Sequence, residues 1–94
     1  MTDAAPRAER RATILNKRGL HARAAAKFVK LAAQFAAEVT VVKDGVAVSG
    51  RSIMGLMMLA AGPGSELALS AAGPDAEAAL DAIAALIAAR FDED

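Results

Sequence analysis

Two runs rich in β-branched residues, Glu38–Lys43 and Val46–Ser49, are separated only by the pair Asp44-Gly45. Asp-Gly is a preferred pair for a two-residue type I′ turn, in which both central residues have positive φ. The two runs are therefore predicted to be antiparallel neighbours in one sheet. This hairpin constrains the fold more directly than any other feature of the chain.

The remaining sequence alternates between short strands and helices. Two further β-prone runs predict strands over residues 11–15 and 66–70. Apolar side chains at i, i+3, i+4 and i+7 predict helices over about 22–35 and 75–91, and a shorter helix fits 52–60. The order βαββαβα lacks the βαβ repeat of a parallel sheet. We therefore predict an α+β open-faced two-layer sandwich, with three helices on one face of a four-stranded antiparallel sheet.

The chain of 94 residues has room for one domain. Residues 1–10 are rich in alanine and charge without any periodicity, which predicts a disordered lead-in. The folded domain is expected to span residues 11–91, and an acidic tail is expected over residues 92–94. The longest apolar stretch, residues 53–61, is far too short to span a bilayer, and the opening residues lack the apolar core of a signal peptide. We expect a cytoplasmic protein without membrane insertion.

The composition excludes several kinds of chemistry. The chain has no cysteine and one histidine, so disulfides, thiolate nucleophiles and histidine-rich metal sites are not expected. Eight of the eleven basic residues lie between Arg7 and Lys30, where Glu9 is the single acid. This asymmetry predicts that the first third of the chain meets a negative group, either phosphate, nucleic acid or an acidic protein surface. Without Tyr or Trp, stacking platforms for nucleic acid are poor, and we expect no nucleic-acid partner.

The only histidine, His21, directly precedes the first predicted helix. No Ser, Thr, Asp or Asn stands there, so the first amides of that helix are open for a phosphate group. The positive end of the helix and Arg23 favour the neutral, nucleophilic imidazole. Phosphohistidine oxygens could then be held by the amides of Ala22 and Arg23 and by the guanidinium of Arg23. The alternative is that His21 is a surface residue that serves only as a cap.

The stretch NKRGLHARAAAKFV resembles the active-site signature of the HPr phosphocarrier family, and GRSIMGLMMLAAGPGSELALSAAGPDA resembles that family's regulatory serine segment. The resemblance covers about residues 11–91. It implies strand order 1-4-2-3 and phosphorylation of His21 at Nδ1 by enzyme I charged from phosphoenolpyruvate, followed by transfer to enzyme IIA. The resemblance further implies that Arg23 supports both transfers and that the protein is a monomeric carrier without cofactor or turnover. HPr proteins usually have proline after that arginine, whereas Ala24 stands here, which we take as a hint of a nitrogen-related branch.

Ser52 matches the serine that HPr kinase/phosphorylase modifies in the family. Ser52 also has the position of a helix cap, so regulation and capping are both open. The helix that follows is apolar on all sides, which indicates either a wholly buried helix or a docking surface. The resemblance assigns the partner surface to five residues: Leu20, Ala22, Ile53, Met54 and Met57.

Two other functions remain open at this point. The basic first third could belong to a regulatory α/β module that binds an anion or nucleic acid without covalent chemistry. An enzyme with its own turnover would need a general acid or base beside His21, and no motif supplies one.

Overall fold

The computed structural model describes residues 6–93. Seven regular elements and one terminal turn follow one another in the predicted βαββαβα order: β1 Arg7–Thr13, α1 Ala22–Ala32, β2 Glu38–Lys43, β3 Val46–Ser49, α2 Ile53–Met58, β4 Glu66–Ala72, α3 Ala76–Ala88 and the 3₁₀ turn η1 Arg90–Asp92.

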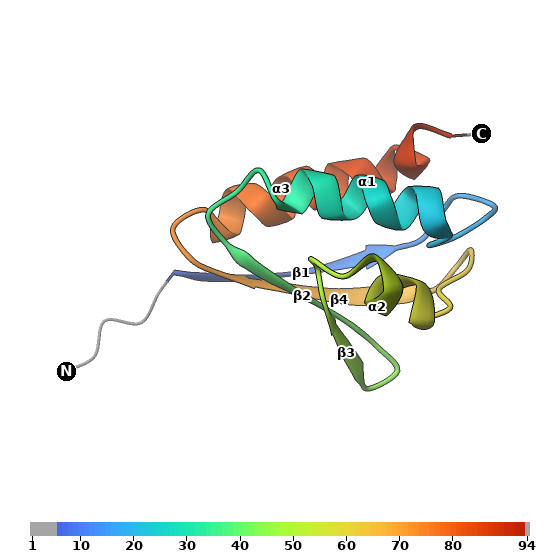
Figure 1. Ribbon diagram of the computed structural model, residues 1–94, viewed down its shortest axis with the longest axis horizontal. Helices are drawn as coiled ribbons and strands as arrows, with labels where there is room; N and C mark the ends of the chain where they lie inside the picture. The colour runs from blue at the N-terminus through green and yellow to red at the C-terminus, as the bar shows by residue number, and fades with distance from the viewer. Residues whose placement is uncertain (1–5, 94) are drawn as a thin grey trace.

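The four strands form one antiparallel sheet in the order β1-β4-β2-β3. Helices α1 and α3 lie side by side over one face of this sheet, and α2 lies at its end beside β3 (Figure 1). The predicted open-faced sandwich and its strand order are confirmed. Within residues 6–93, no helix is long and apolar enough to cross a membrane.

The β2–β3 hairpin has the turn that its sequence predicts. Asp44 and Gly45 both have positive φ, at 50° and 82°, as a type I′ turn requires. In the resulting register Val42 pairs with Ala47 and Lys43 with Val46. The prediction of antiparallel neighbours is therefore confirmed.

Strand β1 begins earlier than predicted, at Arg7. The prediction of a disordered lead-in over residues 1–10 is therefore wrong from Arg7 onward. Arg7 already pairs with Ala72, and the register continues to Thr13 opposite Glu66. The sequence did not predict this part of the strand because its residues are mostly charged. Charged residues are tolerated here because β1 lies at the edge of the sheet and alternate side chains face solvent. Residues 1–5, the rest of the predicted lead-in, lie outside the described residues.

The ends of the helices also differ from prediction. Helix α1 stops at Ala32 because the chain tightens into turns, with Gln34 N–H donating to Leu31 O and Phe35 N–H to Ala32 O. Helix α3 stops at Ala88 rather than near residue 91. Within the predicted acidic tail, Asp92 ends the turn η1, and Glu93, the residue after it, is hydrogen-bonded to Asn16 of the domain.

The core lies between the sheet and the helices α1 and α3. Its largest members, which the solvent does not reach, include Phe28 from α1 and Phe91 from η1. Val41 and Leu69 contribute from the central strands. Asn16 is the only buried polar residue among residues 6–93, and it lies in the loop from β1 to α1.

That loop approaches the loop after α2 at Gly19. Gly19 has φ 64°, and a Cβ atom there would lie 2.1 Å from the carbonyl oxygen of Ala61. The next amide, that of Leu20, donates to the same oxygen at 2.9 Å. The close approach therefore fixes where α1 begins.

We predict that Gly19→Ala lowers the free energy of unfolding by about 2–4 kcal/mol, because the new methyl group adds a backbone clash to a left-handed conformation. Urea denaturation followed by circular dichroism measures the change. Gly62→Ala is the matched control, since a Cβ at Gly62 meets no atom within 4 Å. Equal stability of the two variants would contradict this account.

Candidate functional site

Helix α1 begins without a side-chain cap, as predicted. His21 is its N-cap residue, with extended backbone angles, and its side chain makes no capping hydrogen bond. The first helical hydrogen bond runs from Ala25 N–H to His21 O at 2.9 Å. The amides of Ala22, Arg23 and Ala24 precede this bond and have no carbonyl partner within the helix. This end of α1 can therefore receive an anion.

The imidazole of His21 contacts a carboxylate that the sequence did not reveal. Its Nε2 atom lies 2.9 Å from Oε2 and 3.0 Å from Oε1 of Glu93. The side chains are 15% and 18% exposed, so the pair is largely shielded from water. A carboxylate only accepts hydrogen bonds, so Nε2 carries the proton. In the neutral ring, Nδ1 then holds the lone pair.

Asn16 links the loop before α1 to Glu93 at the C-terminal end of the domain. Its Nδ2 atom donates to Gly19 O at 2.9 Å and to Glu93 Oε1 at 2.8 Å. Because both partners are acceptors, the orientation of the amide group is determined. The Oδ1 atom is buried and finds no hydrogen-bond partner in the described part of the chain. Asn16 thus fixes the loop before His21 and the carboxylate beside it together.

The chain reaches His21 from α3 through a left-handed turn. Arg90, Phe91 and Asp92 have φ of 58°, 55° and 58°, a conformation that costs about 1–2 kcal/mol for each residue other than glycine. Burial of the Phe91 ring contributes about 1.5–3 kcal/mol and offsets part of this cost. Lys27 of α1 also donates from Nζ to Phe91 O at 2.6 Å. The turn thereby brings Glu93 back over the start of α1.

The predicted site residues at the start of α1 differ in their exposure to solvent. Ala22 and Arg23 are exposed in the first turn of the helix, beside His21. Leu20 is 5% exposed and belongs to the core. Its assignment to a partner surface is therefore wrong, because its side chain packs inward where the loop meets Ala61.

Ser52 caps α2, since its Oγ accepts a hydrogen bond from Gly55 N–H at 2.8 Å. Of the apolar residues in this helix, only Leu56 is buried. Four others are exposed, which excludes a wholly buried helix. Exposure was predicted for three of them, Ile53, Met54 and Met57. It was not predicted for Met58, which is the most exposed at 78%.

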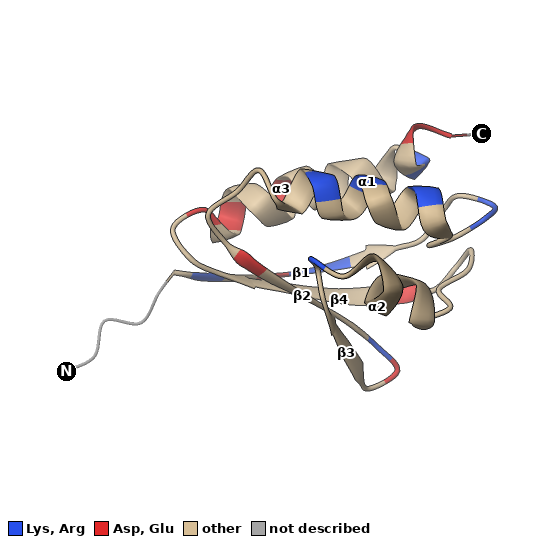
Figure 2. Ribbon diagram, viewed as in Figure 1, with Lys and Arg blue, Asp and Glu red and all other residues tan. Residues whose placement is uncertain are grey.

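Basic residues lie along the whole of α1 and on the loop that leads into it. Figure 2 shows Lys and Arg along this helix and on the loop that leads into it, whereas the acidic residues of the domain lie mainly elsewhere. The residues concerned are Lys17, Arg18, Arg23, Lys27 and Lys30. The exception is the C-terminal turn, where Glu93 lies within this positive region.

The sequence did not predict three residues of the site, which are Asn16, Lys27 and Glu93. Glu93 is separated from His21 by 72 positions, and no local pattern reports such a contact. The available signal was Phe91, which continues the apolar stripe of α3 and must therefore lie on the core. A residue two positions later remains close to that core.

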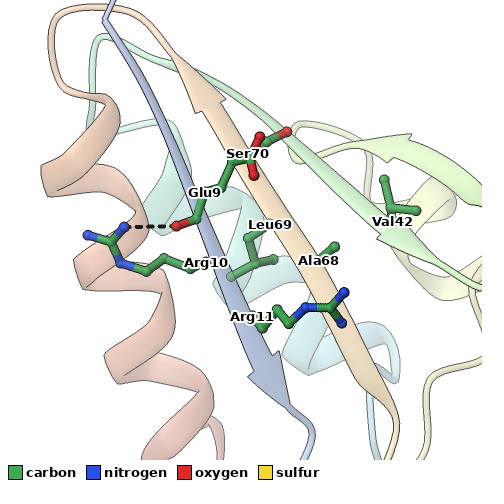
Figure 3. A pocket seen from close by; sticks show the side chains of 7 residues that line it. All are labelled: Glu9, Arg10, Arg11, Val42, Ala68, Leu69 and Ser70. Carbon is green, nitrogen blue, oxygen red and sulfur yellow. Dashed lines mark hydrogen bonds between the residues drawn. The ribbon is translucent and has the colours of Figure 1, made fainter.

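A separate hollow of about 420 Å³ lies on the sheet, where the central strand β4 carries small side chains (Figure 3). Ala68 and Ser70 form its floor, with Arg11 and Val42 to the sides. None of the residues of the His21 site lines it. Among residues 6–93, no cluster of three or more His, Cys, Asp or Glu could hold a metal ion.

Comparisons with known proteins identify the family to which this chain is similar. A family model described as "PTS HPr component phosphorylation site" matches residues 8–89. A phosphocarrier protein HPr from Cupriavidus necator is 53% identical over 90% of this chain and 96% of its own length. A phosphocarrier protein NPr from Shewanella violacea is 52% identical over 90% and 93%. The crystal structure of an HPr from Thermoanaerobacter tengcongensis superposes with a TM-score of 0.88 at 44% identity, over 93% of this chain and 98% of the other.

The Glu93 contact predicts a pH-dependent site. The hydrogen bond from Asn16 is the main cause that lowers the pKa of Glu93 below its ordinary 4.5. Burial of the carboxylate opposes this by raising the pKa. The hydrogen bond from His21 and the charges of His21 and Arg18 lower the pKa further. The ionised carboxylate therefore stabilises the folded chain above pH 4.5, and this stability is lost as the pH falls through the lowered pKa.

We expect the side-chain amide resonances of Asn16 to shift in NMR spectra on acidification below pH 4.5, when the Glu93 contact is lost. Glu93→Gln should remove this transition, because glutamine does not ionise. An unchanged transition in the variant would contradict the assignment to Glu93.

Proposed function

Because this chain belongs to the HPr family of phosphocarrier proteins of the phosphotransferase system, we propose that Nδ1 of His21 accepts a phosphoryl group from phosphorylated enzyme I and passes it to enzyme IIA. One observation carries this assignment to His21. The imidazole lies at the uncapped start of α1, and its Nε2 atom is already engaged by Glu93. The free lone pair is then on Nδ1.

In the transfer, the Nδ1 lone pair attacks phosphorus and forms the new N–P bond. The bond between phosphorus and the donor atom of enzyme I breaks, and its electron pair returns to that atom. The open amides of Ala22 and Arg23 and the Arg23 guanidinium hold the phosphoryl oxygens. Delivery to enzyme IIA repeats the step with His21 as the leaving group, so the protein is a carrier without turnover of its own.

The surface around His21 fits serial docking. The basic residues of α1 attract acidic partners and accelerate their encounter. Ile53, Met54 and Met57, together with Met58, offer a flexible apolar contact that suits more than one partner. We expect one copy of the chain to be sufficient, although the solved relatives include an HPr dimer; the mass in solution under working conditions tests this expectation.

We predict that incubation with phosphoenolpyruvate and enzyme I adds one acid-labile phosphate, and that His21→Ala abolishes it. Arg23→Ala should slow phosphorylation on the order of a hundredfold, because a donor to the transferred group is lost. Arg11→Ala, on strand β1 and away from the site, is the control for lost positive charge. Intact-protein mass spectrometry at neutral pH and after acid treatment measures the modification. Phosphate on His21→Ala, or none on the unaltered protein, would refute the carrier function and favour a non-covalent anion-binding module.

Ser52 is the proposed regulatory site. With ATP and HPr kinase/phosphorylase, it acquires a phosphate that adds about two negative charges beside the exposed methionines of α2. Docking of acidic partners is weakened by this charge.

We predict an acid-stable phosphate that is lost in Ser52→Ala and retained in Ser49→Ala. The Ser52-phosphorylated protein should accept phosphate from enzyme I more slowly, and Ser52→Asp should reproduce the effect while keeping the cap. Equal rates before and after modification, measured by quenched-flow sampling, would contradict regulation through Ser52.

The choice between sugar uptake and nitrogen control is made by the acceptor. Ala24, in place of the usual proline, favours the nitrogen-related branch, whereas the similarity to an HPr (53%) and to an NPr (52%) fits both branches. Phosphoryl transfer to purified enzyme IIA proteins of both branches, compared at equal concentration, identifies the acceptor.

A further inference from the structure

The C-terminal turn holds Glu93 against His21 through contacts from several parts of the chain. Phe91 is fully buried, and Lys27 binds its carbonyl oxygen. Asn16 donates to Glu93 Oε1. Both carboxylate oxygens lie within 3.0 Å of the same ring nitrogen, Nε2. Contacts from three parts of the chain thus converge on one imidazole–carboxylate pair.

We infer that Glu93 is a positioning residue that keeps the proton on Nε2 of His21, directs phosphorylation to Nδ1 and stabilises the positive charge that the ring acquires. The inference rests on the proposed function, since it concerns the same phosphoryl transfer. A carboxylate that orients an imidazole and stabilises its protonated form has the role of the aspartate in serine-hydrolase triads.

The electron balance of the transfer explains why the charge matters. When the Nδ1 lone pair bonds to phosphorus, the ring keeps its Nε2 proton and becomes cationic. The Glu93 carboxylate, 2.9 Å away, balances this charge in a site with little water. When the N–P bond later breaks, its electron pair returns to Nδ1, and the protonated ring departs as neutral imidazole rather than as an anion.

Apart from the exposed Asp92, the neighbour of Glu93 in the chain, the other charged residues named at this site are positive. Arg18 lowers the pKa of Glu93 by its charge, Arg23 lies in the first turn of α1, and Lys27 binds the C-terminal turn. The open amides of α1 add the positive end of its dipole. Within residues 6–93, Glu93 is the only acidic side chain that contacts the ring.

Chemical phosphorylation tests the direction of attack without enzyme I. Phosphoramidate transfers its phosphoryl group to imidazole nitrogen with loss of ammonia, and the Nδ1 and Nε2 products are distinguished by ¹⁵N and ³¹P NMR. The unaltered protein should give the Nδ1 isomer alone, whereas Glu93→Ala should lose this selectivity and give both. Asp92→Asn is the matched control, because it removes one negative charge from the neighbouring exposed residue, and it should retain the selectivity.

The pH dependence of dephosphorylation tests the charge. Protonated phosphohistidine hydrolyses faster, so the rate of dephosphorylation falls as the pH rises. Glu93→Gln keeps the size and an acceptor oxygen but removes the charge, and it should move the midpoint of this fall to lower pH. A purely structural role for Glu93 would not move the midpoint, and thermal unfolding confirms that each variant is folded.

The outcomes separate this inference from the carrier function. Nε2-phosphohistidine in the unaltered protein, the Nδ1 isomer alone in Glu93→Ala, or coincident pH profiles would overturn the role of Glu93. If Asp92→Asn shifted the pH profile of dephosphorylation as much as Glu93→Gln does, the effect would be one of general charge. The specific role of the Glu93 contact would then be overturned. Each of these results leaves phosphorylation by enzyme I intact, whereas failure of enzyme I to charge the unaltered protein would instead refute the carrier function.

Discussion

The side-chain amide of Asn16 is the constraint on which the rest of the site depends. It is buried, and its two donated hydrogen bonds join the loop before α1 to the C-terminal turn. A buried amide that lost either acceptor would leave a donor without a partner, which is costly in a shielded environment. The position of Glu93 and the path of the chain into His21 are thereby coupled.

Most of the fold follows from local patterns in the sequence. The Asp44-Gly45 turn and the apolar stripes of α1 and α3 gave the correct element order, because each depends on neighbouring residues. The errors lie where tertiary contacts decide. Arg7 joins a strand because β4 offers it a partner, although its own neighbours are charged. The chain leaves α3 early in a left-handed turn, where burial of Phe91 and the hydrogen bond from Lys27 to its carbonyl oxygen offset part of the local cost.

The same distinction applies to the site. The uncapped helix start at His21 and the cap at Ser52 were visible in the sequence, because capping is a property of adjacent residues. The contact of His21 with Glu93 spans nearly the whole chain, and only the folded domain brings the two together. The burial of Leu20 was likewise decided by the packing of two loops.

Strand β1 lies at the edge of the sheet, and its charged side chains have a second role there. A lateral strand exposes unpaired amides and carbonyls, to which a foreign strand can add. Arg10 reaches across to Glu77 and Asp81 of α3, and Arg11 pairs with Glu66. Such charged side chains hinder aggregation through strand addition. Part of the basic character of the first third of the chain therefore serves colloidal solubility rather than phosphate chemistry.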